Sequence, residues 1–317
     1  MTEDSFELIT PAYNRAFTYG KLRLGLVVPI ESHPNDPVPS MQRHLEKVQL
    51  AEHLGFCSVW LRDVPFNVPS FGDAGQCFDP FVYLGYLAAG TQTIGLGVAS
   101  IILPLRHPAH VAKSAATADQ LSRGRLLLGV ASGDRPEEYP ALGMSFHDRG
   151  QRFRESYEYI RAMATRYPAI DNAHGKLNGA IDMLPKPVND RLPLLITGAS
   201  EQSPDWLAAN GDGWITYPRR VEIQERIIRV WRENTAQSGR SPQPAVQSLY
   251  IDLVKDDIPP QPIHLGFRSG INYLRTHLRA LETIGINHVA LNLRLNNADL
   301  ESTLERISAE LIPEFTD

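Results

Sequence analysis

Runs of apolar residues alternate along this chain with segments in which apolar positions recur at helical spacing. The clearest case begins with Ile94–Leu103, an almost uninterrupted apolar run of the kind found in parallel strands buried on both faces. Beyond Pro104 and Pro108 the apolar residues recur at helical spacing, and Arg125–Val130 forms the next apolar run. This order predicts a strand, a crossover helix and a second parallel strand.

The same alternation continues through the chain and predicts eight strands. They are expected at Leu22–Ile30, Cys57–Asp63, Ile94–Leu103, Arg125–Val130, Leu194–Thr197, Trp214–Tyr217, Ser248–Val254 and His288–Leu293. Helices are expected between them, one of them starting with Asp79 as N-cap and Pro80 as first helical residue. The stretch Pro168–Pro193 has no clear period and forms an insertion between strands four and five. Such alternation predicts a parallel α/β sheet, but periodicity alone does not distinguish a closed barrel from an open doubly wound sheet.

The segment around strands three and four carries a further signal. It reads IILPLRHPAHVAKSAATADQLSRGRLLLGVASG and resembles the core signature of the bacterial-luciferase-like flavin oxidoreductases. The stretches WLRDVPF, FGDAGQCFDPFVYLGYLAAGT and GVASGDRPEE resemble a subgroup usually labelled luciferase-type oxidoreductase. The resemblance covers about Lys21–Leu293 and implies a (β/α)8 TIM barrel as a single domain over residues 1–317. Residues 1–20 are then expected to lie across the barrel as an irregular segment.

Composition limits the class of protein. With 43% hydrophobic and 21% charged residues, the chain has the make-up of a soluble globular enzyme. A formal net charge of -5 and the lack of a basic block argue against nucleic acid as a partner. The amino terminus has no apolar core of a signal peptide, and Gly and Pro interrupt every long apolar run, so we expect a cytoplasmic protein without a membrane helix.

Metal and disulfide chemistry are not expected. Cys57 and Cys77 are too few for a disulfide framework and lack the spacing of metal ligands. Strand one is followed by a lone His33, whereas barrel metallohydrolases usually need two histidines there. The sequence therefore predicts reduced thiols and no metal site.

Polar side chains at strand ends are the candidates for catalysis, because function in such barrels collects at the carboxyl ends of strands. Glu31 ends strand one, and Arg62 with Asp63 ends strand two. The luciferases carry a catalytic histidine after strand two, which this chain lacks. We therefore expect Asp63 or Glu31 to handle protons while they approach each other over the cofactor, with Arg62 pairing with a carboxylate or holding an anionic substrate. The alternative is a structural Arg–Asp pair that closes the mouth of the barrel.

The resemblance also implies a seat for a flavin ring. In the family the ring lies over strand three, where a cis peptide between non-proline residues bulges toward it; here that bond is Ala99–Ser100. The alternative is a strand end of small residues that simply packs closely. After strand four the reactive cysteine and adjacent phosphate-binding arginine of the family are replaced by Ala131 and Ser132. Light emission and luciferase-type aldehyde oxidation are therefore not implied, and Ser132 is expected to contact the cofactor.

A phosphate site is expected where strand five runs into the next helix. A helix N-terminus presents free N–H groups and a positive dipole end. By resemblance, Ser200 and Ser203 occupy the positions of phosphate-binding hydroxyls, Glu201 lies between them, and Arg149 matches the phosphate-contacting arginine. The alternatives are that Ser203 is only the N-cap before Pro204 and that Arg149 is a solvated charge.

These features favour an FMN-dependent oxidoreductase, a monooxygenase that uses reduced flavin and O2 on a small organic substrate and receives the flavin from a separate reductase. One alternative is the deazaflavin F420, whose anionic tail needs extra basic groups; only Arg135, Arg149 and Arg152 are candidates for that role. Another is a flavin-binding protein without turnover.

The oligomeric state is predicted from the helices after strands two and three. Their apolar residues offer more surface than one exterior helix layer should expose, which predicts a homodimer. The residues concerned are Tyr83, Tyr86, Leu87, Val111 and Ala115.

Overall fold

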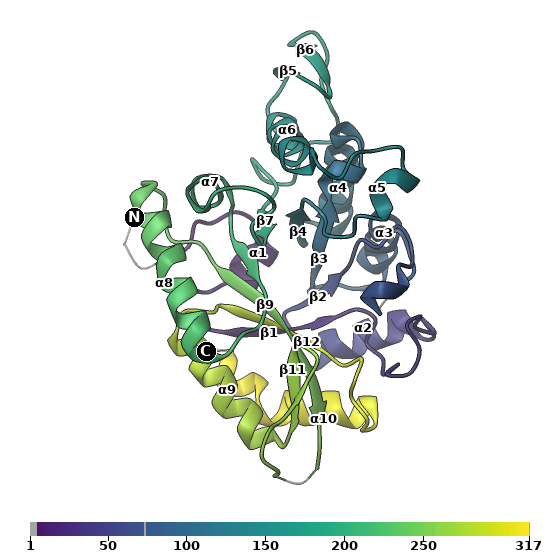
Figure 1. The fold of residues 1–317 in the computed structure, drawn as a ribbon, viewed down its shortest axis with the longest axis vertical. Helices are drawn as coiled ribbons and strands as arrows, with labels where there is room; N and C mark the ends of the chain where they lie inside the picture. The colour runs from purple at the N-terminus through teal and green to yellow at the C-terminus, as the bar shows by residue number, and fades with distance from the viewer. Residues whose placement is uncertain (1–4, 73, 256, 317) are drawn as a thin grey trace.

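Eight parallel strands close into a barrel in the computed structural model, which describes residues 5–72, 74–255 and 257–316 (Figure 1). β1 (Arg23–Val27) pairs with β2 (Ser58–Leu61) on one side and with β12 (His288–Asn292) on the other. The remaining barrel strands are β3 (Gly95–Ile102), β4 (Leu126–Ala131), β7 (Leu194–Thr197), β8 (Trp214–Thr216) and β9 (Ala245–Leu253). β9 pairs with both β8 and β12 and so closes the ring. The predicted (β/α)8 barrel is therefore confirmed.

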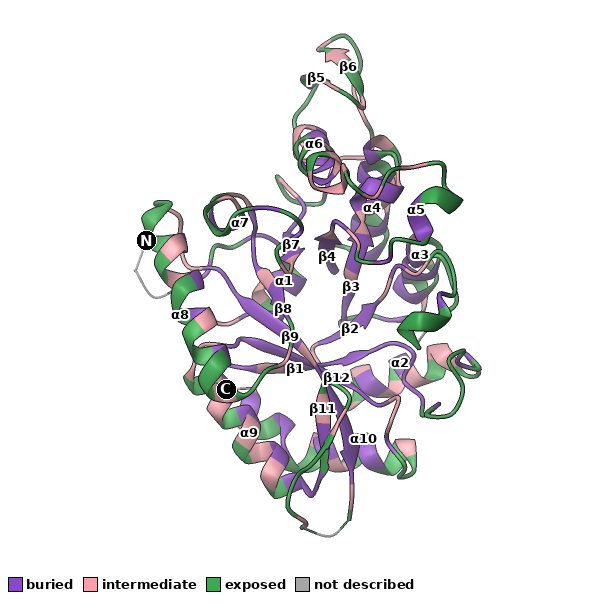
Figure 2. Cartoon of the chain, in the orientation of Figure 1, coloured by how far each residue is buried: buried purple, intermediate pink, exposed green. Residues whose placement is uncertain are grey.

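Helices surround the barrel and bury their apolar faces on it (Figure 2). They are α2 (His44–His53), α3 (Pro80–Gly90), α4 (Pro108–Ser122), α6 (Arg149–Ala162), α7 (Pro204–Asn210), α8 (Val221–Gln237), α9 (Ile271–Thr283) and α10 (Leu300–Glu310). The cap predicted for α3 is present, because the Asp79 carboxylate accepts the amide N–H groups of Phe81 and Val82 at 3.0 and 3.1 Å. Among the described residues no helix is both long and apolar enough to cross a membrane.

A short helix at the start of the chain closes the N-terminal end of the barrel. Thr10 caps α1 (Pro11–Ala16), whose side chains join the inward-facing residues of the strands in a separate apolar cluster. The Tyr13 hydroxyl donates to the backbone oxygen of Asp212 at 2.5 Å, and Phe17 lies edge-on to His288. The segment expected to lie irregularly across the barrel is thus partly helical and acts as its floor.

Glycines make room inside the barrel for two large rings. A Cβ atom on Gly97 would lie 2.4 Å from the Trp60 ring, and one on Gly25 would lie 2.8 Å from Nε2 of His288. Trp60 Nε1 donates to His288 Nε2 at 2.9 Å, so the two rings form a bonded layer between α1 and the upper cavity. This layer separates the two ends of the barrel.

Three segments contain structure that the periodicity did not predict. The insertion after β4 holds the hairpin β5 (Ala169–Asn172) and β6 (Gly175–Asn178), which projects from the barrel in Figure 1. A second hairpin, β10 (Gln261–Ile263) and β11 (Gly266–Ser269), extends the sheet beyond β9. β9 also begins at Ala245, before the expected start at Ser248, because Gln247 interrupts the apolar pattern of the strand although it is buried. The remaining short helices are η1 (Pro69–Phe71), η2 (Leu103–Leu105), α5 (Glu138–Ala141) and η3 (Ile312–Phe315).

Candidate active site

A cavity of about 410 Å³ opens at the carboxyl ends of the barrel strands. Its floor is apolar and comes from inward-facing residues of five strands, Val27, Trp60, Ile215, Val246 and Ala290. Polar side chains from the strand ends and the following loops form its upper wall. A concave site with an apolar floor and a few polar groups is the usual form of a small-molecule or cofactor site.

The end of β3 bulges beside this cavity. The Ala99–Ser100 peptide bond is cis, as predicted, and both residues line the cavity. The register of β3 against β4 shifts between Val98 and Ile101, and the Ser100 hydroxyl hydrogen bonds to that of Thr197. Bulges of this kind re-aim strand residues next to functional sites. The structure thus places Ala99 and Ser100 where a bound ring could contact them.

A turn after β7 presents unused amide groups to the same cavity. Gly198, Ser200 and Glu201 have φ values of 56°, 44° and 59°, in the left-handed region that non-glycine residues rarely adopt. No acceptor among the described residues takes the amide N–H of Ala199, Ser200 or Glu201. Successive free amides in such a turn form a concavity that binds anions. The turn at residues 198–201 therefore fits a phosphate group.

The side chains expected at this phosphate site are only partly brought together. Ser200 lines the cavity, with its hydroxyl donating to the Thr197 backbone oxygen at 2.8 Å. Ser203 is not among the lining residues; its Oγ accepts the Trp206 amide at 3.3 Å and caps α7. Because Pro204 starts the helix, the Ser203 hydroxyl faces the first helical turn rather than the cavity. The capping alternative for Ser203 is the one the structure supports.

Arg149 also lines the cavity and is not a solvated helix charge. Its guanidinium carbon lies 3.7 Å from the centre of the Phe146 ring, and Nη2 lies 2.6 Å from Glu201 Oε1. The Nε atom is buried and has no hydrogen-bond partner among the described residues. The Phe146 ring and the Glu201 carboxylate thus hold the Arg149 guanidinium beside the turn at residues 198–201, and its Nε–H remains available as a donor.

Asp63 is already engaged by an arginine that the sequence did not single out. Its two carboxylate oxygens accept Nε and Nη2 of Arg106 at 3.0 and 2.8 Å, and the Ile102 amide donates to it at 3.1 Å. Arg106 also reaches Asp79 at 3.1 Å. The structural Arg–Asp pair considered as an alternative thus exists, but with Arg106 in place of Arg62. Arg62 lines the cavity.

Glu31 does not meet Asp63 over the cavity. Its carboxylate accepts the amide and hydroxyl of Ser40 at 2.6 and 3.1 Å and lies 3.3 Å from Lys47 Nζ. It is not among the residues that line the cavity. The loop before α2 draws this side chain away from the barrel mouth, so the expected pairing of Glu31 with Asp63 is corrected.

Glu138 is a titratable group in the cavity that sequence reasoning did not select. It starts α5, is 2% exposed, and lies 3.6 Å from Arg135 Nη1. Its Oε1 atom has no hydrogen-bond partner among the described residues. Burial raises the pKa of Glu138, and the nearby Arg135 charge opposes that rise. The only sequence signal was the spacing of opposite charges in DRPEE.

Ser132 lines the cavity as expected and is part of a tight corner. The Tyr139 hydroxyl donates to the Ser132 backbone oxygen, and burial raises the pKa of Tyr139 to about 12, so this hydroxyl stays a donor at neutral pH. Among the described residues no group of three His, Cys, Asp or Glu side chains is arranged to hold a metal ion. The chemistry available here is that of two buried carboxyl groups, Asp63 and Glu138, several cations and an anion-binding turn.

Comparison with known proteins assigns the family. The model of the luciferase-like monooxygenase family matches residues 22–256. An uncharacterized protein of Mycobacterium tuberculosis is 35% identical over 199 residues, which cover 60% of this chain and 70% of that protein. The barrel, the cavity at its strand ends and this family match define the class, and the chain belongs to the luciferase-like monooxygenase family.

Two solved structures share the fold. An F420-dependent secondary alcohol dehydrogenase superposes with a TM-score of 0.77 at 19% identity, covering 94% of this chain and all of that one. The oxygenating constituent of 3,6-diketocamphane monooxygenase from Pseudomonas putida, solved with FMN, gives a TM-score of 0.74 at 14% identity, covering 93% of this chain and 99% of that one. At these identities the likeness establishes the fold alone, and both cofactor types occur on it.

Proposed function

We propose that this protein is an FMN-dependent monooxygenase that acts on a small organic substrate with reduced flavin and O2. The observation that carries the proposal is the turn at residues 198–201, which lines the cavity together with Arg149 and has amide N–H groups that no described residue accepts. Free amides and one guanidinium suit a single terminal phosphate. When bound, the flavin supplies the redox and oxygen chemistry, while the protein supplies orientation and excludes water.

The surface outside the phosphate turn favours FMN over F420. A groove beyond Glu201 is lined by Ser145, His147, Asp148, Gly150, Gln151, Arg154, Glu201 and Gln202. It carries two carboxylates, and its one arginine is bound to Gln202 at 2.9 Å. The two carboxylates are already paired with Arg149 and Arg152, so an anionic tail that leaves the cavity would find only Arg154 as a further cation among the described residues of the groove. FMN ends at its phosphate and needs no further cation.

Each residue group of the cavity has its own role in this proposal. The apolar floor and the Ala99–Ser100 bulge would hold the ring, and Ser132 would contact it. Asp63 acts on the site through Arg106 and the Ile102 amide, which makes it a positioning residue in this proposal. Arg62 lines the cavity and would contact a substrate there, and Glu138 is the group we assign to proton transfer. The reduced flavin would come from a separate reductase.

The cofactor assignment is tested by titrating the apoprotein with FMN, riboflavin and F420. We expect FMN to bind about 10- to 100-fold more tightly than riboflavin, the value of a charge-assisted hydrogen bond to the phosphate. The Arg149→Gln variant should lose most of this preference. Arg152→Gln is the matched control, because Arg152 lies on the same helix, pairs with Asp148 at 3.0 Å and does not line the cavity.

Two results would contradict the proposal. Tighter binding of F420 than of FMN would show that the cofactor is F420 and not FMN. The second result is FMN binding without oxygen consumption when reduced flavin and a broad panel of organic compounds are supplied. It would show a protein that binds flavin but has no monooxygenase activity.

A further inference from the structure

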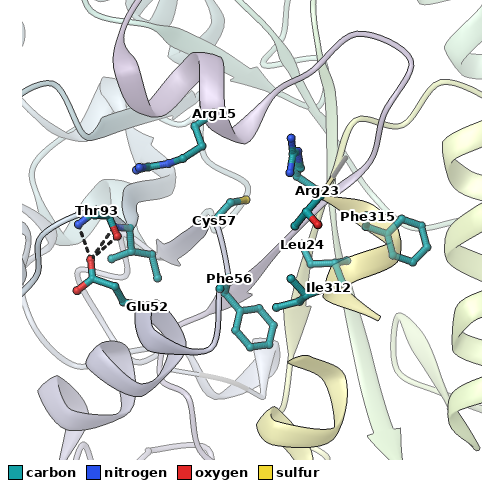
Figure 3. Close-up of a pocket in the computed structure, with 12 residues that line it drawn as sticks. Arg15, Arg23, Leu24, Glu52, Phe56, Cys57, Thr93, Ile312 and Phe315 are labelled. Atoms are coloured by element: carbon teal, nitrogen blue, oxygen red, sulfur yellow. Dashed lines mark hydrogen bonds between the residues drawn. The ribbon is translucent and has the colours of Figure 1, made fainter. Parts of the chain in front are cut away.

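A second cavity, of about 250 Å³, lies at the opposite end of the barrel (Figure 3). α1, the start of β1, the residues that precede β2 and β3, and η3 form its walls. It shares no lining residue with the candidate active site, and the layer of Trp60 and His288 lies between the two. Whatever this cavity binds is therefore bound away from the proposed flavin.

The walls of this N-terminal cavity combine apolar side chains with two cations. The apolar part comes from Leu24, Phe56, Ile94, Ile312 and Phe315. Arg15 enters from α1 and Arg23 from β1, and Figure 3 shows them on either side of Cys57. Such a surface suits a ligand with an apolar body and an anionic end.

The two guanidinium groups pair with no anion among the described residues. No acceptor among the described residues takes a hydrogen bond from either side chain, and neither forms an ion pair in the described part of the chain. The Nε atom of Arg23 is buried and has no hydrogen-bond partner in the described part of the chain. A buried charged donor that is left unsatisfied is costly, so an arrangement of this kind calls for a ligand to complete it.

The other polar groups of the cavity do not supply the missing charge. Burial raises the pKa of the Cys57 thiol to about 11, although Arg23 and Arg15 lower it, so the thiol is neutral. Glu52 directs its carboxylate to the backbone, where it accepts the amides of Gln92 and Ile94 at 2.9 and 2.8 Å (Figure 3 shows its bond to Thr93). Burial opposes its ionisation, yet these amides outweigh burial and lower its pKa.

We infer that this cavity binds a small amphipathic carboxylate. The carboxylate pairs with Arg15 and Arg23, whose planar guanidinium groups match it in shape and charge. The apolar body packs against Phe56, Ile312 and Phe315. An apolar cavity of about 150 Å³ holds benzene, so the present volume suits a body of one aromatic ring or a short alkyl chain. The walls offer little to a free inorganic phosphate, which has no apolar body.

The inference is tested with 3-phenylpropanoate as the probe, titrated calorimetrically into the full chain. The uncharged 3-phenylpropanamide and inorganic phosphate are the comparison ligands. We expect the carboxylate to bind at least about tenfold more tightly than either, and Arg15→Gln and Arg23→Gln each to weaken it about 10- to 100-fold. Arg229→Gln is the matched control, because its side chain is 70% exposed on α8, away from the cavity.

Several outcomes would overturn the assignment. These are equal binding of the acid and the amide, tighter binding of phosphate than of the acid, or unchanged binding in both arginine variants.

Asp317 follows Thr316 of the cavity wall but lies outside the described residues, so Asp317→Asn is titrated as well. It should bind the probe at least as tightly as the parent, and a loss of binding there would also count against the inference. Arg15 is exposed and its side chain makes no hydrogen bond or ion pair among the described residues, so its variant should fold even if the Arg23 variant does not. None of these measurements depends on flavin.

Discussion

In the turn after β7, both the backbone and the side chains offer groups to the proposed phosphate site. The free amides at residues 199–201 come from the left-handed conformation of the chain, whereas only one of the two expected serines, Ser200, lines the cavity. The spacing of the serines was visible in the sequence. The direction of each hydroxyl was not, because it depends on where Pro204 starts the helix.

Ser200→Ala should therefore weaken FMN more than riboflavin, because only FMN carries the phosphate. The expected loss is about 10-fold in the ratio of the two dissociation constants. Ser203→Ala should leave this ratio unchanged and lower the stability of the protein by about 1 kcal/mol through the lost helix cap. Fluorescence titration and urea unfolding measure the two effects. Equal changes of the ratio in both variants would remove the distinction between the two serines.

Glu138 provides a second test at the residue scale. Its raised pKa means that it keeps its proton above the usual carboxyl range, near pH 4.3 in unfolded peptides. Infrared spectra of the apoprotein should show a protonated carboxyl band that persists above that range, absent in Glu138→Gln and present in Glu137→Gln, whose side chain is exposed. Turnover of Glu138→Gln should fall about 10²-fold. A parent protein without such a band would exclude Glu138 as a proton donor.

The elements of the barrel were predictable where burial is simple. All eight barrel strands and the Asp79 cap of α3 follow from apolar runs and helix signals. The hairpins β5–β6 and β10–β11 were missed because their strands have only three or four residues and because β5, β6 and β10 are largely exposed, so no apolar period is visible. Ion pairs between residues far apart in the sequence were missed as well. Nothing near Asp63 in sequence indicates that Arg106 will be its partner.

The layer of rings inside the barrel makes stability depend on pH. Burial lowers the pKa of His288 to about 3, whereas the unfolded chain titrates near 6.5. The unfolded state therefore binds the proton first, and the free energy of unfolding falls as pH drops below 6.5. The loss from this group between pH 7 and pH 5 is about 2 kcal/mol.

Urea unfolding at these two pH values measures the effect. We expect His288→Gln to show a smaller loss than the parent, whatever its stability at pH 7, and exposed His53→Gln to behave like the parent. An identical pH dependence in the parent and in His288→Gln would show that other groups cause it.

At the scale of the whole molecule, the apolar residues on which the dimer prediction was based are mostly internal. Tyr83, Leu87, Val111 and Ala115 are at most 2% exposed, because α3 and α4 pack against each other and the barrel. Periodicity showed that these residues are apolar but not which neighbour covers them. On α3 this leaves Val82 and Tyr86, which are 75% and 52% exposed.

We still expect a homodimer through this face, with Val82 and Tyr86 as its centre. Light scattering at micromolar concentration should give about twice the chain mass of 35.3 kDa. Val82→Glu combined with Tyr86→Glu should give the monomer, while Leu121→Glu, a 62% exposed leucine of α4, serves as the surface control. A monomeric parent protein would end the dimer prediction.

The helix that closes the bottom of the barrel also has a consequence for synthesis. α1 is made early, but its contacts include Asp212 and His288, which leave the ribosome much later. At roughly 5–20 residues per second, the apolar face of α1 waits tens of seconds for its partners. Docking of this helix is thus a late event in folding, and during that delay Tyr13 and Phe17 are the exposed surface that a chaperone would cover.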